Sequence, residues 1–180
     1  MIRQDFATPY CSPQNTLFSR NEILKMELKQ YMAVTVEGYV YTFGEKSNHR
    51  FSKYDYPQAP GDFVESFAPG AFRTSLLLSP QVYLKDEQGQ VIGSTESGEL
   101  QLLEDSRGLF ARAVVQAQVA NYQFSGWSFR YAGARFEWRL VTREPVLCCR
   151  EIKRARLLDV SLLTGRKPPY PGSTAHIVTM

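Results

Sequence analysis

The order of apolar and polar side chains along this 180-residue chain predicts a protein built mainly from strands. β-Branched and aromatic residues fill the segment 34–43, and apolar residues alternate with polar ones over 136–140. Gly38 predicts a bulge in the first of these strands, and Gly108 predicts a hairpin turn with a positive φ. Further strands are expected over 82–84, 91–92, 100–103, 109–115, 127–131, 146–152 and 157–163.

Two other stretches carry helix signals. Ser19 and Glu22 have the spacing of a capping box, and the apolar positions that follow share one helical face to about residue 30. Pro69, near the first turn of a second apolar stretch, predicts a helix that ends near residue 78.

These elements predict an N-terminal arm with a short helix over residues 1–30 and a single domain over residues 31–180. The fold class is α+β, with a strand-rich, barrel-like antiparallel or mixed sheet and a few flanking helices. A chain of this length buries roughly 70% of its extended surface, so it needs neither disulfides nor a metal for stability. The loop over 44–61 is long for a compact domain, and we interpret it, together with residues 1–18, as a partner-contact region.

Charge and composition limit the classes of partner that we expect. The 21 basic and 18 acidic side chains give a net charge of +3. The longest basic stretch, 150–156, is interrupted by an acid, so no nucleic-acid partner is expected. No segment approaches the ~20 apolar residues of a membrane span, and the first residues do not resemble a secretory signal, so we expect a cytoplasmic protein. Cys11, Cys148 and Cys149 are predicted to be reduced thiols, because the adjacent pair would point to opposite faces of a strand.

Few residues are suited to catalysis. Histidine, the usual general base near neutral pH, occurs only at positions 49 and 176, and no spacing of histidine and cysteine suits zinc. The chain has no glycine-rich nucleotide loop, and we predict no cofactor. Ser128 lies in a turn of small residues that leads into an aromatic strand. From the residues alone this is either an ordinary turn or the place of a nucleophile, which needs a base and oxyanion donors.

Six segments give this serine a context, and they follow one another in a fixed order. They include E-S-F-A-P-G-A-F at 65–72, E-D-S-R-G-L at 104–109 and S-G-W-S-F at 125–129. The remaining three cover 37–44, 90–95 and 158–164. In this order they resemble the motifs of the capsid-maturation (prohead) serine proteases of tailed bacteriophages, a family similar in fold to the herpesvirus assemblins. The resemblance spans about residues 36–164.

The resemblance implies the roles of individual residues. Ser128 falls at the position of the family's nucleophile. The family's catalytic histidine falls at Lys85, so the resemblance leaves Lys85 or His49 as the base. Asp159 stands where the family often has a glutamate and is a candidate orienting group. Arg130 replaces a glycine that is usual in the family.

Two functional hypotheses follow from the resemblance. In the first, the chain is a serine hydrolase of virion assembly that cleaves the capsid or scaffold protein with which it associates. In the second, it is a pseudoenzyme that keeps the fold as a binding or scaffolding module. The second is favoured by the chemistry of Lys85, because a lysine accepts a proton only after losing its charge, which Asp86 and Glu87 oppose. An unrelated barrel that binds a small ligand is a third interpretation. The sequence leaves open whether the chain forms a homo-oligomer.

Overall fold

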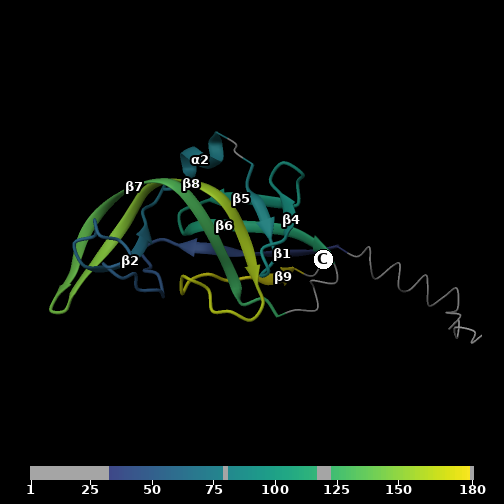
Figure 1. The fold of residues 1–180 in the computed structure, drawn as a ribbon. Coiled ribbons are helices and arrows are strands. Elements are labelled where there is room, and N and C mark those ends of the chain that lie inside the picture. Colours follow the sequence, from purple (N-terminus) through teal and green to yellow (C-terminus); the bar gives the residue numbers. More distant parts are fainter. Residues whose placement is uncertain (1–32, 79–80, 117–122, 179–180) are drawn as a thin grey trace, which may run out of the picture.

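The structure, a computed structural model, describes residues 33–78, 81–116 and 123–178. The predicted arm over residues 1–30 therefore lies outside the described residues. The strands form two sheets (Figure 1). Neighbours in the first sheet are all antiparallel. In spatial order it contains β5 (Leu100–Glu104), β6 (Gly108–Gln116), β1 (Ala33–Thr42) and β9 (His176–Val178).

The second sheet is mixed and is organised around one long strand, β8 (Val146–Leu163). One edge of β8 pairs antiparallel with β7 (Gly126–Arg143), and this long hairpin is strongly curved (Figure 1). The other edge pairs in parallel with two separate strands, β2 (Asp62–Phe67) and β3 (Tyr83–Lys85). β4 (Val91–Ser94) extends the sheet beyond β3.

A short helix, α2 (Arg73–Leu77), and the turn before it occupy the edge of β8 between β2 and β3. The amide of Ala155 donates to the carbonyl of Ala71 at 2.9 Å, and the amide of Leu157 donates to Ser75 Oγ at 3.2 Å. These two bonds satisfy backbone donors that neither parallel strand reaches. The helix begins later than the sequence predicts, because the residues after Pro69 form turns.

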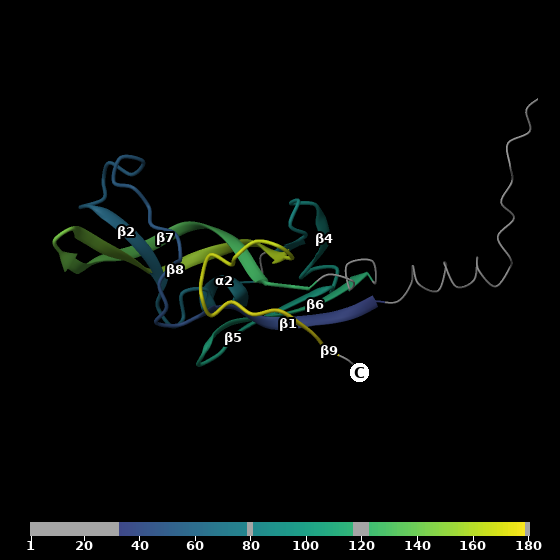
Figure 2. The ribbon, with the colours of Figure 1, turned by 90° about the horizontal axis from the view of Figure 1, so that it is seen from below.

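The main hydrophobic core lies between the two sheets, which Figure 2 shows as two layers. On β8, Ala155 and Leu157 face this core, but further along it is Val160 and Leu162 that do so. The register with β7 shifts at the same place, so that one strand has an extra residue there. This bulge turns Asp159 and Ser161 toward the outer face of the sheet.

The strand-rich class is confirmed, with mixed and antiparallel sheets, but the described strands do not close into a barrel. The strand pairs predicted over 127–131 and 136–140, and over 146–152 and 157–163, are in fact the continuous strands β7 and β8. The bulge of β1 lies between Tyr39 and Tyr41 rather than at Gly38. The predicted hairpin of β5 and β6 is confirmed.

Gly108 has a different role from the one predicted. It is not among the glycines with positive φ. A Cβ at this position would lie 1.9 Å from the carbonyl oxygen of Tyr41, so the glycine allows two backbones to approach closely.

The loop over 44–61 has a hydrophobic cluster of its own, separate from the main core. Phe51 stacks on Phe63 of β2 with ring centroids 4.9 Å apart, and Tyr56 packs edge-on against Phe63 at 5.3 Å. The loop is therefore anchored to the sheet, which its polar composition did not indicate. None of the helices in the described ranges has the length and apolar character needed to cross a bilayer.

Candidate active site

One residue from each of three neighbouring strands, β7, β8 and β3, forms a row across the second sheet. Ser128 on β7 lies directly opposite Ser161 on β8, and Ser161 lies opposite Lys85 on β3. Residues that are opposite one another in a sheet project from the same face. This is the outer face, because the alternate residues Trp127 and Leu162 lie in the core. All three side chains of this row are partly exposed.

A second row lies next to the first. Asp159 of β8 is opposite Arg130 of β7 and Tyr83 of β3. Its carboxylate, with a side chain only 3% exposed, accepts a bond from Lys85 Nζ at 3.1 Å and one from Arg130 Nε at 2.8 Å. Arg130 Nη2 also contacts the same oxygen. The structure therefore brings Lys85 and Asp159 together in an ion pair, with Arg130 as a third member.

The electrostatics of this group favour charged side chains. Burial alone would raise the pKa of Asp159, but the hydrogen bonds from Arg130 and Lys85 outweigh it and hold that pKa below its ordinary value. The hydrogen bond to Asp159 raises the pKa of Arg130. Lys85, whose side chain is 17% exposed, forms an ion pair with this carboxylate. A lysine ammonium has no lone pair with which to accept a proton, so Lys85 would have to lose a proton before it could act as a base.

Ser161 lies between the nucleophile and the base that the resemblance implies. Neighbouring strands are about 4.8 Å apart, so Ser128 and Lys85 are separated at their backbones by roughly 10 Å. A lysine side chain can span much of that distance, but Lys85 extends along the sheet to Asp159 instead of across Ser161. Sequence reasoning placed Ser161 within a family-like segment but gave it no role, since only the strand register reveals its position.

The segment before Ser128 is held rigidly. Gly126 has φ of 146°, and a Cβ on it would lie 2.6 Å from Pro168 Cγ and 3.1 Å from the carbonyl oxygen of Ser173. The amide of Trp127 donates to Ser173 Oγ at 2.8 Å, and Ser125 Oγ donates to the carbonyl of Arg166 at 2.7 Å. The turn over 165–173 therefore fixes the start of β7 and, with it, the position of Ser128.

The two histidines lie elsewhere. The ring of His49 packs edge-on against Phe51, with centroids 4.6 Å apart. Phe51 stacks on Phe63, which pairs with Cys148 near the start of β8, whereas Ser128 pairs with Ser161 near its end. His176 lies in the other sheet, with Nε2 3.8 Å from Glu37 Oε1.

Metal binding and thiol chemistry have little support in the described ranges. No group of three or more histidine, cysteine, aspartate or glutamate side chains gathers there in a way that could hold a metal ion. Cys148 and Cys149 are buried and form no disulfide with each other, and Cys11 lies outside the described residues. Cys149 Sγ lies 3.1 Å from Ser66 Oγ, so it forms part of the packing between β2 and β8.

Comparison with known proteins identifies a family for the chain. Neither a curated protein nor a solved structure matches the chain. A family model, described as caudovirus prohead serine protease, matches residues 22–180. That range contains both rows of the candidate site and all the described strands. The chain belongs to the caudovirus prohead serine protease family.

Proposed function

We propose that this protein acts in phage capsid maturation by cutting peptide bonds in scaffold or capsid protein, with Ser128 as the nucleophile. The observation that carries the proposal is the row of Ser128, Ser161 and Lys85 on one outer face of the sheet. A partly exposed serine on a rigid strand, with an amine on the same face, supplies two of the parts that a serine–lysine hydrolase requires, a nucleophile and a candidate base. The family to which the chain belongs supplies the reaction type and the partner.

The proposed reaction begins when the Lys85 ammonium leaves Asp159 and gives one proton to bulk water, which makes it a neutral amine. The proton of the Ser128 hydroxyl passes to Ser161 Oγ while the Ser161 proton passes to Lys85 Nζ, and Ser128 Oγ attacks the carbonyl carbon of the peptide. When the C–N bond breaks, the leaving amine takes a proton from the Lys85 ammonium. Water then hydrolyses the acyl-serine ester and regenerates the hydroxyl.

The alternative is a pseudoprotease that binds the same partner without cleaving it. One observation favours it, namely that Lys85 Nζ is bonded to an aspartate that Arg130 also contacts. Arg130 occupies the position where the family usually has glycine. In this alternative, Lys85, Asp159 and Arg130 form a permanent ion cluster on the binding face, and Ser128 has no base.

A cleavage assay separates the two functions. The full chain and its Ser128→Ala variant are incubated with the capsid and scaffold proteins of the same phage genome, and the products are identified by mass spectrometry. The protease proposal expects products from the unmodified chain and none from Ser128→Ala. Ser106→Ala, which changes an exposed serine in the turn of β5 and β6, is the control and should cleave normally. Equal patterns from the unmodified chain and Ser128→Ala would support the pseudoprotease.

The identity of the base is tested in the same assay. Lys85→His places an imidazole at the position of the family's base, and we expect cleavage to rise by about 10²-fold, the usual contribution of a general base. His49→Ala is expected to leave cleavage unchanged. If His49→Ala abolishes cleavage, the loop histidine is the base and the proposed role of Lys85 is wrong.

A further inference from the structure

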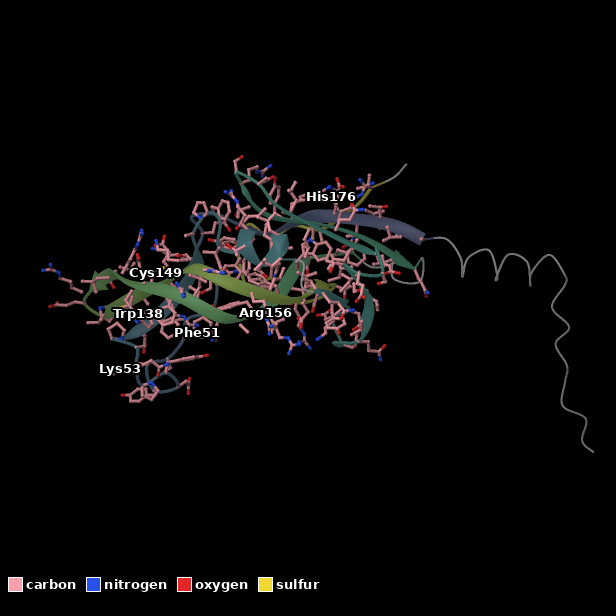
Figure 3. The ribbon with its side chains drawn as sticks, turned by 90° about the horizontal axis from the view of Figure 1, so that it is seen from above. Phe51, Lys53, Trp138, Cys149, Arg156 and His176 are labelled. Carbon is pink, nitrogen blue, oxygen red and sulfur yellow. The ribbon has the colours of Figure 1, made fainter. Side chains whose placement is uncertain are left out.

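A pocket of about 370 Å³ lies where the helix α2 meets the curved part of the β7–β8 hairpin. It is notable for its charge, since three arginines and no acidic residue line it. In Figure 3, Arg156 lies on the side of β8 away from His176 and the first sheet. Its lining includes Thr74, Ser75, Leu78, Arg135, Arg154 and Arg156.

The arrangement of these arginines is electrostatically unfavourable without an anion. Arg135 of β7 is directly opposite Arg154 of β8, and like charges at opposite positions of an antiparallel pair repel. Arg156, also exposed, adds a third positive charge to the same pocket. A negatively charged group in the pocket would remove this repulsion and accept hydrogen bonds from the guanidinium groups.

Other arginines of the same hairpin differ from these three. Arg130 pairs with Asp159, Arg139 pairs with Glu151, and Arg150 pairs with Glu65. Within the part of the chain that the structure describes, Arg135, Arg154 and Arg156 form no ion pair. The hairpin thus pairs three arginines with acids and leaves three others facing a cavity. Arg143, at the end of β7, also forms no ion pair among the described residues, but it does not line the pocket.

The surroundings of the pocket suit a polypeptide carboxylate. Leu78 lines the pocket, and it and Leu77 are among the most exposed large apolar side chains of the described residues. An acidic side chain flanked by apolar residues would pair with the arginines and cover these leucines. The planar guanidinium binds a carboxylate in a bidentate manner, which a cavity of this size accommodates for a single side chain.

The pocket lies on the same face as the candidate site. Ser128 and Arg130 alternate with core residues of β7, and the next outward position, Ala132, is opposite Arg156. At ~3.3 Å per residue, Ala132 is about 13 Å from Ser128 along the strand. An extended peptide bound at Ser128 would therefore present a side chain to the pocket about four residues from the bond at the serine.

We infer that Arg135, Arg154 and Arg156 form a subsite that binds an acidic side chain of the capsid or scaffold segment. The inference rests on the proposed function in assigning the segment to that partner. It does not require cleavage, because a pseudoprotease would use the same subsite to hold its partner.

Binding of labelled peptides tests the subsite. The probes are two fluorescein-labelled octapeptides of alanine and leucine that differ only in one central residue, glutamate or glutamine. The protein is the full chain with Ser128→Ala, so that no cleavage occurs, and fluorescence anisotropy is measured at low and moderate NaCl concentrations. We expect the glutamate peptide to bind at least tenfold more tightly than the glutamine peptide, with a difference that shrinks as salt increases.

Variants then locate the binding. Arg154→Gln should reduce the affinity for the glutamate peptide to that for the glutamine peptide. Arg112→Gln, which removes one exposed charge from β6 in the other sheet, should leave the affinity unchanged. The melting temperature of Arg154→Gln should be equal to or above that of the parent, because the change relieves repulsion from Arg135. Arg154→Lys keeps the charge without the planar fork, and it should give an intermediate affinity.

Three outcomes would overturn the inference. They are equal affinities for the two peptides, equal losses in Arg154→Gln and Arg112→Gln, and tighter binding of a six-nucleotide single-stranded DNA that depends on Arg154. The last would assign the pocket to phosphates. None of them bears on cleavage, which the Ser128→Ala comparison tests separately, and a negative cleavage assay leaves peptide binding intact.

Discussion

Two buried carboxylates on the second sheet, those of Glu65 and Asp159, have different kinds of hydrogen-bond partner. Glu65 on β2 is enclosed: it accepts bonds from Arg150 Nε at 2.8 Å, Tyr131 Oη at 2.7 Å and Tyr170 Oη at 3.4 Å. Its arginine is only 15% exposed. Burial and the charge of Glu65 raise the pKa of both tyrosines, so their hydroxyls remain donors.

Among the described residues, the hydrogen-bond partners of Asp159 are two long cationic side chains. Lys85 and Arg130 reach it from two neighbouring strands, and the Arg130 side chain is 67% exposed. These side chains can rotate into water, whereas the rings around Glu65 are fixed in the core. On this sheet, a buried ion pair that aromatic rings enclose is structural. A buried ion pair that flexible cations cover can rearrange.

The largest effect is expected for Glu65→Gln. Arg150 would keep a nearly buried charge without its counter-ion, and breaking a buried pair in this way costs about 3 kcal/mol or more. The midpoint of urea unfolding should fall at constant m-value. Glu137→Gln is the control, because Glu137 is exposed and pairs with Lys153 at the surface, and it should change stability by less than about 0.5 kcal/mol. Equal shifts for the two variants would remove the distinction drawn here.

Asp159→Asn should cost less stability, about 1–2 kcal/mol, because Arg130 can turn into solvent. Its effect on cleavage should be an increase, since Lys85 would no longer be held in an ion pair with a carboxylate. Unfolding in urea and the cleavage assay measure the two effects on the same sample. A loss of cleavage would instead make Asp159 an orienting group that the reaction needs.

Tyr131→Phe tests how much one hydroxyl donor to Glu65 contributes to stability. Glu65 keeps Arg150 and Tyr170 as donors, so removal of one hydroxyl should cost about 1 kcal/mol. Tyr83→Phe is a matched control, because the Tyr83 hydroxyl bonds only the exposed side chain of Gln81 among the described residues. A shift for Tyr131→Phe as small as that control would show that Glu65 does not need its ring of donors.

The smallest expected effect is on how stability depends on pH in acidic solution. The folded-state pKa of Asp159 is below the ordinary value of 3.8, so its contribution to stability is present above that pH and is lost as pH falls through the folded value. The stability difference between the parent and Asp159→Asn should therefore narrow below about pH 3.8, by less than 1 kcal/mol. Urea midpoints at a series of pH values measure this difference. A difference that stays constant down to pH 2 would contradict the lowered pKa.

The sequence predicted the strand class and most strand positions, because alternation and β-branched residues are local signals. It did not predict β2, since Asp62–Phe67 joins a polar loop to a turn and pairs with a distant strand. It also divided β7 into two strands, 127–131 and 136–140, because bulges between Ala132 and Phe136 interrupt the alternation although the strand continues.

For the site, the resemblance supplied Ser128, Lys85 and Asp159, and the residue types gave no way to place them together. The contact between Lys85 and Asp159 depends on parallel pairing of β3 with β8, and the order of strands in a sheet has no local signature. The role of Arg130 and the position of Ser161 depend on the same register. The arginine pocket was interpreted from sequence only as part of a basic stretch, because Arg135 comes from another strand.

Because β8 is central to the second sheet, the candidate site can form only late in synthesis and folding. Lys85 meets Asp159 across 74 positions of the chain, and Glu65 meets Arg150 across 85. Such distant pairings form late in folding, and a nascent chain leaves the ribosome with its N-terminal part first. The row that contains Ser128 is therefore incomplete until β8, which ends at Leu163, has been synthesised. On the proposed function, this topology would keep Ser128 from attacking its partners while the chain is still being made.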